Sequence, residues 1–120
     1  MTSQILNLEP QTRYASMNRI DTIRELLNDC PDDSFLQHAL ALEYIKTGNE
    51  EDARVLFEQI LNREAGYIGS YYHLAKLLER TGQTAEAVRV YEKGMAASKQ
   101  AGDNHAYNEL QSAYEDLIDE

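Results

Sequence analysis

The side chains of this 120-residue sequence best suited to binding a metal are three histidines, His38, His73 and His105. Three histidines hold zinc or iron only when their rings converge to about 2 Å from the metal. These three lie on separate predicted helices, and packed helices are about 10 Å apart. They also differ in helical phase, because one residue turns a side chain by about 100°. We therefore expect no metal site and no bound cofactor.

The sequence shows equally little support for catalysis. Cys30 is the only cysteine, and the nearby charges of Asp29 and Asp32 disfavour its reactive thiolate form. Adjacent acids such as Glu50 and Glu51 point apart on a helix and do not share a site. No glycine-rich phosphate loop follows a strand. We expect a protein that is not an enzyme and, because a lone cysteine cannot form an intrachain disulfide, one that is cytoplasmic.

Charge and hydropathy exclude several classes of partner. The chain has 11 Lys and Arg against 21 Asp and Glu, a formal net charge of −10. Nucleic acids and anionic membranes would repel such a protein. No run approaches the roughly 18 apolar residues of a membrane span, and the first ten residues lack the regions of a secretory signal. We expect neither a nucleic-acid nor a membrane partner.

The spacing of apolar residues predicts an all-α protein. After Pro31 no further proline occurs, and an apolar residue recurs every three or four positions without the alternation typical of strands. We predict six helices joined by tight turns, over 17–29, 34–46, 50–62, 68–80, 84–99 and 103–118.

Local signals mark the ends of several of these helices. Lys-Thr-Gly at 46–48 and Arg-Thr-Gly at 80–82 each place a cation in the last turn and a glycine just beyond it. Ser34 and Gln37 have the spacing of a capping box. Asn49 is predicted to cap the helix that follows it, because three acidic residues come next.

The chain repeats itself at a distance of 34 residues. The shift superimposes Leu40 on Leu74, Ala41 on Ala75, Gly48 on Gly82, Ala53 on Ala87 and Phe57 on Tyr91. Gln37-x-x-Leu40-Ala41-x-x-Tyr44 followed by Ala53-x-x-x-Phe57, with its second copy, resembles the tetratricopeptide repeat. The small alanines allow the two helices of a repeat to approach closely, and bulkier residues there would cost about 1–3 kcal/mol. Gln37 and Tyr71 replace the family's usual tryptophan, so we expect looser packing at the outer end of the first repeat.

The resemblance implies a short right-handed solenoid of helix hairpins over residues 17–118. It divides this domain into a half repeat over 17–33, repeats over 34–67 and 68–101, and a capping helix over 102–118. Residues 1–16 form an N-terminal extension without helical periodicity. This extension is either disordered or covers the apolar flank, including Leu36 and Leu40, that a missing upstream helix leaves open. A second copy could cover that flank instead and form a two-fold homodimer.

The resemblance also implies a function in protein–protein interaction. First helices of such repeats line a concave groove that commonly binds a peptide or protein segment, which predicts a small adaptor or scaffold without catalysis. The matching positions in this chain are Phe35, His38, Leu42, Ile45, Tyr72, Lys76, Arg80, Leu110 and Tyr114. Some of them, such as Phe35, Leu42 and Leu110, could instead simply pack against neighbouring helices.

Two other ligand classes deserve comparison with this groove. The family's chaperone-tail receptors hold a C-terminal carboxylate with lysine, asparagine and arginine. The matching positions here are His38, Leu42, His73, Asp103 and Tyr107, which make a poor carboxylate clamp. The alternative to an adaptor is a small-molecule or metal-binding regulatory protein that uses the aromatic, histidine-dotted groove.

Overall fold

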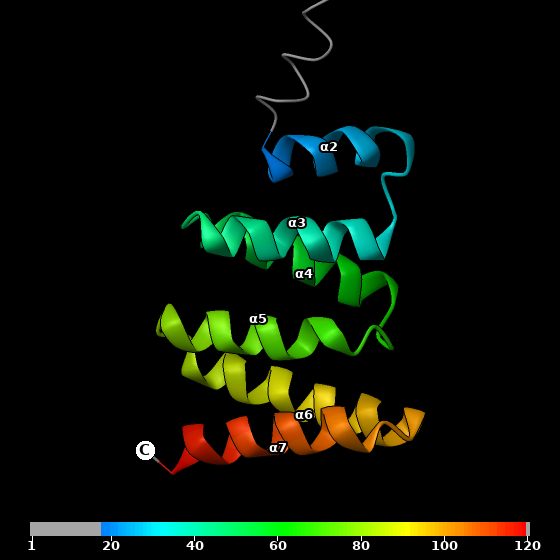
Figure 1. Ribbon diagram of the computed structural model, residues 1–120. Coiled ribbons are helices and arrows are strands. Elements are labelled where there is room, and N and C mark those ends of the chain that lie inside the picture. Colours follow the sequence, from blue (N-terminus) through cyan, green and yellow to red (C-terminus); the bar gives the residue numbers. More distant parts are fainter. Residues whose placement is uncertain (1–17, 120) are drawn as a thin grey trace, which may run out of the picture.

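The computed structural model describes residues 18–119, which form six α-helices and contain no strand (Figure 1). Residues 1–17 and 120 lie outside this description, and so does the predicted N-terminal extension. The helices are α2 (Arg19–Asp29), α3 (Ser34–Lys46), α4 (Glu50–Arg63), α5 (Gly69–Arg80), α6 (Thr84–Ala101) and α7 (Asn104–Ile118). The predicted all-α class is confirmed, and each helix end lies within two residues of its predicted position.

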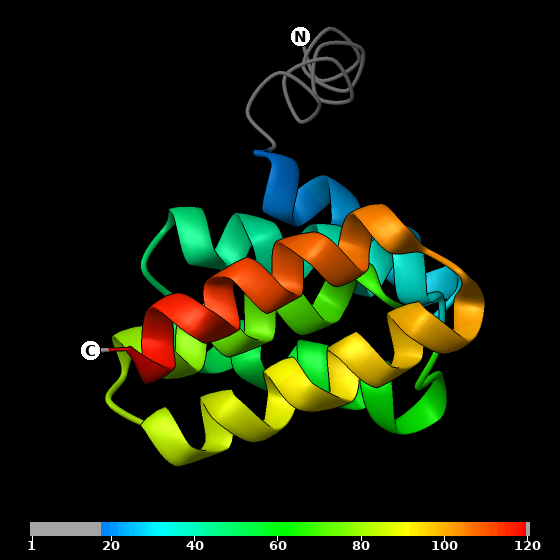
Figure 2. The ribbon, with the colours of Figure 1, turned by 90° about the horizontal axis from the view of Figure 1, so that it is seen from below.

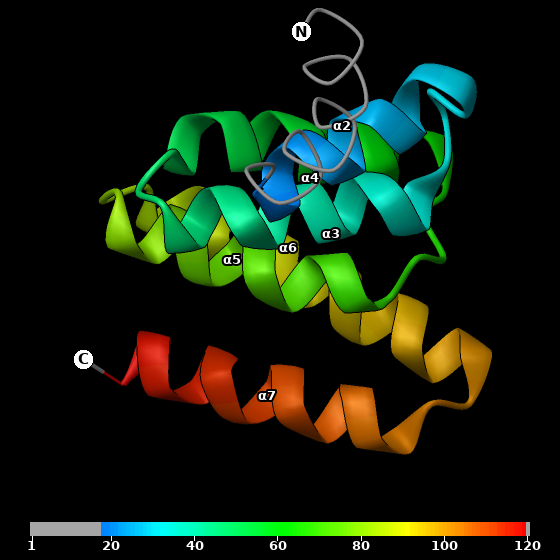
Figure 3. The same ribbon diagram turned by 45° about the horizontal axis from the view of Figure 1, so that its top comes forward.

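The helices form a short solenoid in which each packs mainly against the next along the chain. Figure 1 shows them stacked from α2 at the top to α7 at the bottom, and Figure 3 shows α4 and α6 behind α3 and α5. In the view from below, α6 forms one edge of the stack (Figure 2). Such an array is held together by contacts between neighbours. No helix within residues 18–119 is long and apolar enough to cross a bilayer.

Small residues set the spacing of the paired helices. Ala41, Ala53, Ala75 and Ala87 are all completely buried. Phe57 and the other large residues of the repeat pattern are buried beside them, namely Leu40, Tyr44, Leu74 and Tyr91. Each seam therefore joins methyl groups from one helix to large side chains from the other, the arrangement in which added bulk is poorly tolerated.

Two turns end their helices in the same way, 34 residues apart. Gly48 and Gly82 have φ angles of 84° and 79°, in the left-handed region that favours glycine. The residue after each glycine, Asn49 or Gln83, donates its backbone N–H at 2.8 Å to the carbonyl five positions earlier. Asn49 stands at the N-cap position of α4, as predicted, but its side chain bonds to Thr47 and makes no capping hydrogen bond.

The start of α3 also differs from the prediction. Asp33 caps the helix, because its carboxylate accepts the Leu36 N–H at 2.9 Å. Ser34 lies inside the helix, and its hydroxyl donates to Glu64 Oε1 at 2.6 Å. The predicted capping box of Ser34 and Gln37 is therefore wrong, since both side chains bond to other partners.

Gln37 and Tyr71, which replace the family's tryptophan, each donate a hydrogen bond of the same kind. Gln37 Nε2 donates to the Pro31 carbonyl at 3.1 Å, and the Tyr71 hydroxyl donates to the Ala65 carbonyl at 2.6 Å. In both cases the acceptor lies six residues earlier. Gln37 also accepts a 2.7 Å hydrogen bond from Arg63 and is 6% exposed, against 5% for Tyr71. The first repeat's outer end is thus closed by a polar network, and Gln37 is about as deeply buried as Tyr71.

One glycine allows α6 to approach both of its neighbours. A Cβ atom on Gly94 would lie 2.7 Å from Tyr71 Cβ of α5 and 3.0 Å from Leu110 Cδ1 of α7. Such distances are not compatible with a real side chain in the same place. Gly94 therefore fixes how closely α5 and α7 pack against the middle of α6.

The flank of the first repeat is covered by α2. Ile23 and Leu40 are each 5% exposed, and Arg24 Nε donates to the Tyr44 hydroxyl at 3.0 Å. The prediction that an apolar surface is left open at Leu40 is therefore wrong, because α2 covers it. Leu36 is only half-buried, and a homodimer through this flank stays a prediction.

Candidate functional site

A pocket of about 520 Å³ lies on the outer face of α3 and extends to α5. We call it the α3–α5 pocket. Helix α3 supplies most of its lining, α5 supplies one histidine, and α2 supplies one arginine. The lining residues are Arg19, Phe35, His38, Ala39, Leu42, Glu43, Ile45, Lys46 and His73.

Helix α3 can form this pocket because it is apolar on two sides. Residues 37, 40, 41 and 44 face the core, whereas Phe35, Leu42 and Ile45 lie along the opposite stripe. Both stripes follow the three- and four-residue spacing of one helix face. Leu42 and Ile45 are half-buried and pack against the core, whereas Phe35 remains on the surface. Phe35 is 71% exposed, the highest value among the exposed large hydrophobic residues of the described chain.

Two histidines form the side of the pocket towards α5. The rings of His38 and His73 are 5.5 Å apart, and the His38 ring is also 5.5 Å from that of Phe57. His38 Nδ1 lies 2.8 Å from the Ser70 hydroxyl. Burial, and then the neighbouring His73, lower the pKa of His38 to about 4, and burial lowers the pKa of His73. Both rings are therefore neutral at pH 7 and extend the apolar wall.

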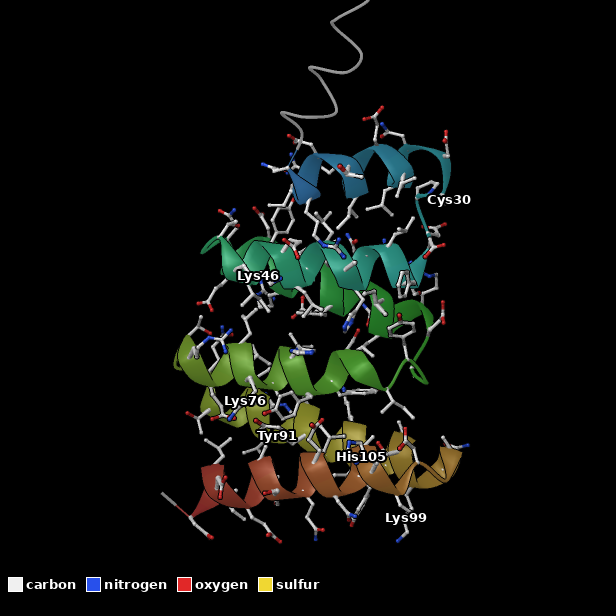
Figure 4. All side chains as sticks on the ribbon, in the orientation of Figure 1. Cys30, Lys46, Lys76, Tyr91, Lys99 and His105 are labelled. Carbon is white, nitrogen blue, oxygen red and sulfur yellow. The ribbon has the colours of Figure 1, made fainter. Side chains whose placement is uncertain are left out.

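The third histidine lies elsewhere. His105 is exposed near the start of α7 (Figure 4). Within residues 18–119, no three histidine, cysteine or carboxylate side chains are grouped so that they could hold a metal ion. His38 and His73 are half-buried and pack against aromatic rings.

The charged side chains of the pocket share a single acceptor atom. Arg19 Nε and Lys46 Nζ each lie 3.2 Å from the same oxygen, Oε2 of Glu43. The Glu43 side chain is only 13% exposed, whereas those of Arg19 and Lys46 are 68% and 71% exposed. Two cations against one carboxylate leave this rim with a net charge of +1.

Three predicted groove residues lie outside the pocket. The Tyr72 ring packs against His73 at 5.7 Å, and Lys76 Nζ lies 6.0 Å from the centre of the Tyr72 ring. Arg80 donates to Glu50 of α4 at 2.8 Å. Lys76 and Arg80 therefore already have intramolecular partners.

The two predicted residues on α7 do not line the pocket either. Leu110 is 1% exposed, so its assignment to a binding surface is wrong. The physical reason is the close approach at Gly94, which brings Leu110 into the core. Tyr114 is half-buried, and its hydroxyl lies 3.5 Å from Glu92 of α6.

Sequence reasoning assigned Phe35, His38, Leu42 and Ile45 to the groove and considered His73 only as a clamp position. It missed four lining residues, Arg19, Ala39, Glu43 and Lys46. The repeat contained a signal for Lys46, because it lies 34 residues before the predicted Arg80. Arg19 comes from α2, where the repeat pattern says nothing about side chains that reach α3.

A larger cleft of about 910 Å³ lies between α4, α5 and α6. Its floor includes Tyr71, Leu74 and Leu78, which are at most 5% exposed. Partly exposed side chains such as Leu61 and Ala97 also line this cleft and give it apolar surface. The α3–α5 pocket, with its exposed Phe35, is the stronger candidate site.

Comparison with known proteins agrees with this architecture. A family model described as Tetratricopeptide repeat matches residues 44–114. The solution structure of a tetratricopeptide repeat domain protein from Salinibacter ruber is 37% identical, with a TM-score of 0.70, and the match covers 72% of this chain and 88% of that one. A search of curated proteins finds no match.

Two more distant solved structures share the fold. A protein from Bordetella parapertussis is 24% identical over 85% of this chain and 89% of its own, with a TM-score of 0.74. The TPR2B domain of yeast Sti1, solved as a complex with pHsp70, is 12% identical over 94% of this chain and 89% of its own, with a TM-score of 0.79. These two likenesses concern the fold alone.

Proposed function

Because this chain belongs to the tetratricopeptide repeat family, we propose that it is an interaction module that holds a segment of a partner protein in the α3–α5 pocket. Domains of this family are generally protein-binding modules and typically have no catalytic activity. The yeast Sti1 domain with the same fold was solved in a complex with pHsp70. Here the protein would act as a small cytoplasmic adaptor, a role consistent with its lone cysteine.

The observation that carries this proposal is the exposure of Phe35 beside the apolar lining of the pocket. Phe35 is 71% exposed and stands beside a pocket that Leu42 and Ile45 also line. Burying an exposed phenylalanine is worth about 1.5–3 kcal/mol, and aromatic residues in pockets are frequent anchors of interfaces. Leu42 and Ile45 already pack partly against the core, so a partner would chiefly bury Phe35.

A peptide-display selection tests the proposal. A random library of peptides is selected against the folded protein, and the enriched peptides are resynthesised and titrated against three forms. These are the unchanged protein, Phe35→Ser, and the matched control Val55→Ser. Val55 is also an exposed large hydrophobic residue, at 40%, but it lies on α4 and does not line the pocket.

We expect enriched peptides whose affinity falls at least tenfold with Phe35→Ser and less than twofold with Val55→Ser. Circular dichroism should show the same helix content in all three forms, because both side chains are exposed. Peptides that bind equally well to both variants, or a selection that enriches none, would overturn the assignment of the pocket.

A further inference from the structure

The rim of the α3–α5 pocket is positive although the protein is strongly acidic. The chain has a formal net charge of −10. Of the described residues that line the pocket, the charged ones are Arg19, Lys46 and Glu43, which sum to +1. At physiological ionic strength charges are screened within about 8 Å, so a bound ligand experiences this rim more strongly than the distant acids.

The two cations are also incompletely satisfied by Glu43. Both contact the same oxygen, Oε2, at 3.2 Å. An arginine has five N–H donors and a lysine has three, far more than one carboxylate oxygen can accept. Since Arg19 and Lys46 are about two-thirds exposed or more, their remaining donors are accessible to a second anion at the edge of the pocket.

We propose that the partner segment held in this pocket carries an aspartate or glutamate close to its apolar anchor, and that this carboxylate binds at Arg19 and Lys46. The inference rests on the proposed function, because it concerns the segment that the same pocket would hold. A single carboxylate neutralises a rim of +1. A phosphate group, at −1.5 to −2, would leave the rim negative. The apolar anchor contacts Phe35, Leu42 and Ile45, and the adjacent acid supplies orientation.

The geometry gives the two parts of the segment different roles. Apolar contact with Phe35 supplies most of the affinity, whereas an exposed ion pair is worth only about 0.2–1 kcal/mol. The carboxylate therefore determines which apolar segments are preferred and in which direction they lie. Without an acid, a segment of the same shape would still bind, but less tightly by a factor of about 1.4 to 5.

The experiment uses the peptides from the display selection as probes. Each Asp or Glu is replaced in turn by Asn or Gln, and the affinities are measured by fluorescence polarisation for the unchanged protein and for Lys46→Glu. The control is Lys99→Glu. Both lysines lie in the last turn of a helix, so both variants change the net charge and the helix end alike (Figure 4). Lys99 does not line the pocket.

We expect one acidic position in the peptides at which the amide weakens binding about two- to fivefold. Lys46→Glu should weaken the acidic peptide by at least as much and leave the amide peptide nearly unchanged, a coupling that a double-mutant cycle isolates. Lys99→Glu should weaken both peptides equally or not at all. Equal effects of Lys46→Glu and Lys99→Glu would overturn the inference.

A second variant tests the same rim in the opposite direction. Glu43→Gln keeps the size of the side chain but removes its charge, so the rim changes from +1 to +2. We expect acidic peptides to bind about two- to fivefold more tightly to Glu43→Gln, with no change for their amide versions. Unchanged or weaker binding of the acidic peptides, with the melting temperature preserved, would contradict the inference.

The outcomes separate this inference from the proposed function. Peptides that depend on Phe35 but contain no acid, or tolerate its amide, would overturn the inference and leave the pocket assignment standing. A selection without any Phe35-dependent peptide would overturn both.

Discussion

Gly94 provides the sharpest test of how this solenoid is packed. It lies in α6, where glycine is normally unfavourable, and a Cβ atom there would lie 2.7 Å from Tyr71 Cβ and 2.9 Å from Tyr71 Cγ. These atoms lie close to the backbone of α5, so a change of rotamer cannot move Cβ away. Gly94→Ala therefore forces α5 and α6 apart.

The expected magnitude is a balance of two effects. Overpacking a core costs about 1–3 kcal/mol, and the upper end applies because a helix backbone must shift. Alanine is better than glycine in a helix interior by about 1 kcal/mol. We therefore expect Gly94→Ala to lower the free energy of unfolding by about 2 kcal/mol.

Urea denaturation followed by circular dichroism measures this change. The matched control is Gly66→Ala, because a Cβ atom at Gly66 meets nothing within 4 Å and its φ angle is not in the left-handed region. We expect the control to stay within about 0.5 kcal/mol of the unchanged protein. If Gly94→Ala were as stable as the unchanged protein or more so, the close approach of α5 and α6 at this point would be refuted.

Three further predictions concern the stability effects of changing one half-buried histidine and two residues that make hydrogen bonds. Because the pKa of His38 is about 4 when folded and 6.5 when unfolded, the unfolded chain binds the proton first as the pH falls. Urea denaturation should therefore show that His38→Gln removes about 2 kcal/mol of the stability loss between pH 7 and pH 5, and a variant that keeps the full loss would contradict the burial of this ring. Tyr71→Phe loses a 2.6 Å hydrogen bond and should lower the thermal midpoint through a loss of about 1 kcal/mol, whereas Tyr114→Phe, with its 3.5 Å contact, should have less effect. Arg63→Met removes the donor that lies 2.7 Å from the buried side-chain oxygen Oε1 of Gln37, and it should lower the free energy of unfolding by about 1–3 kcal/mol. An unchanged midpoint in denaturant would argue against the polar network.

Much of the fold follows from local sequence signals, such as the residues that end helices and the small residues between them. The helices end where Gly48 and Gly82 permit a left-handed residue, and the two turns are alike because the local sequence is alike. Ala53 and Ala87 are completely buried, because only a small residue fits between two closely paired helices. In a solenoid each unit contacts its neighbours, so a repeat in the sequence translates directly into a repeat in space.

The residues that α3 contributes to the pocket could also be predicted in part. Matching this chain to the repeat family assigns Phe35, Leu42 and Ile45 to a binding surface, and all three line the α3–α5 pocket. The prediction that Ser34 caps α3 is wrong, because the adjacent Asp33 accepts the free Leu36 N–H instead. Sequence spacing does not decide the competition between these two residues, since a hydrogen bond to Glu64, the residue after α4, removes Ser34 from it.

The helical class and the 34-residue period could be inferred from the order of the residues, because both depend on contacts within a helix or between chain neighbours. The burial of Leu110, the pairing of His38 with His73 and the sharing of one Glu43 oxygen by two cations could not. They depend on distances of a few ångströms between side chains of different helices. The lack of a side chain at Gly94, or the length of the Arg19 side chain, changes such distances without altering the repeat.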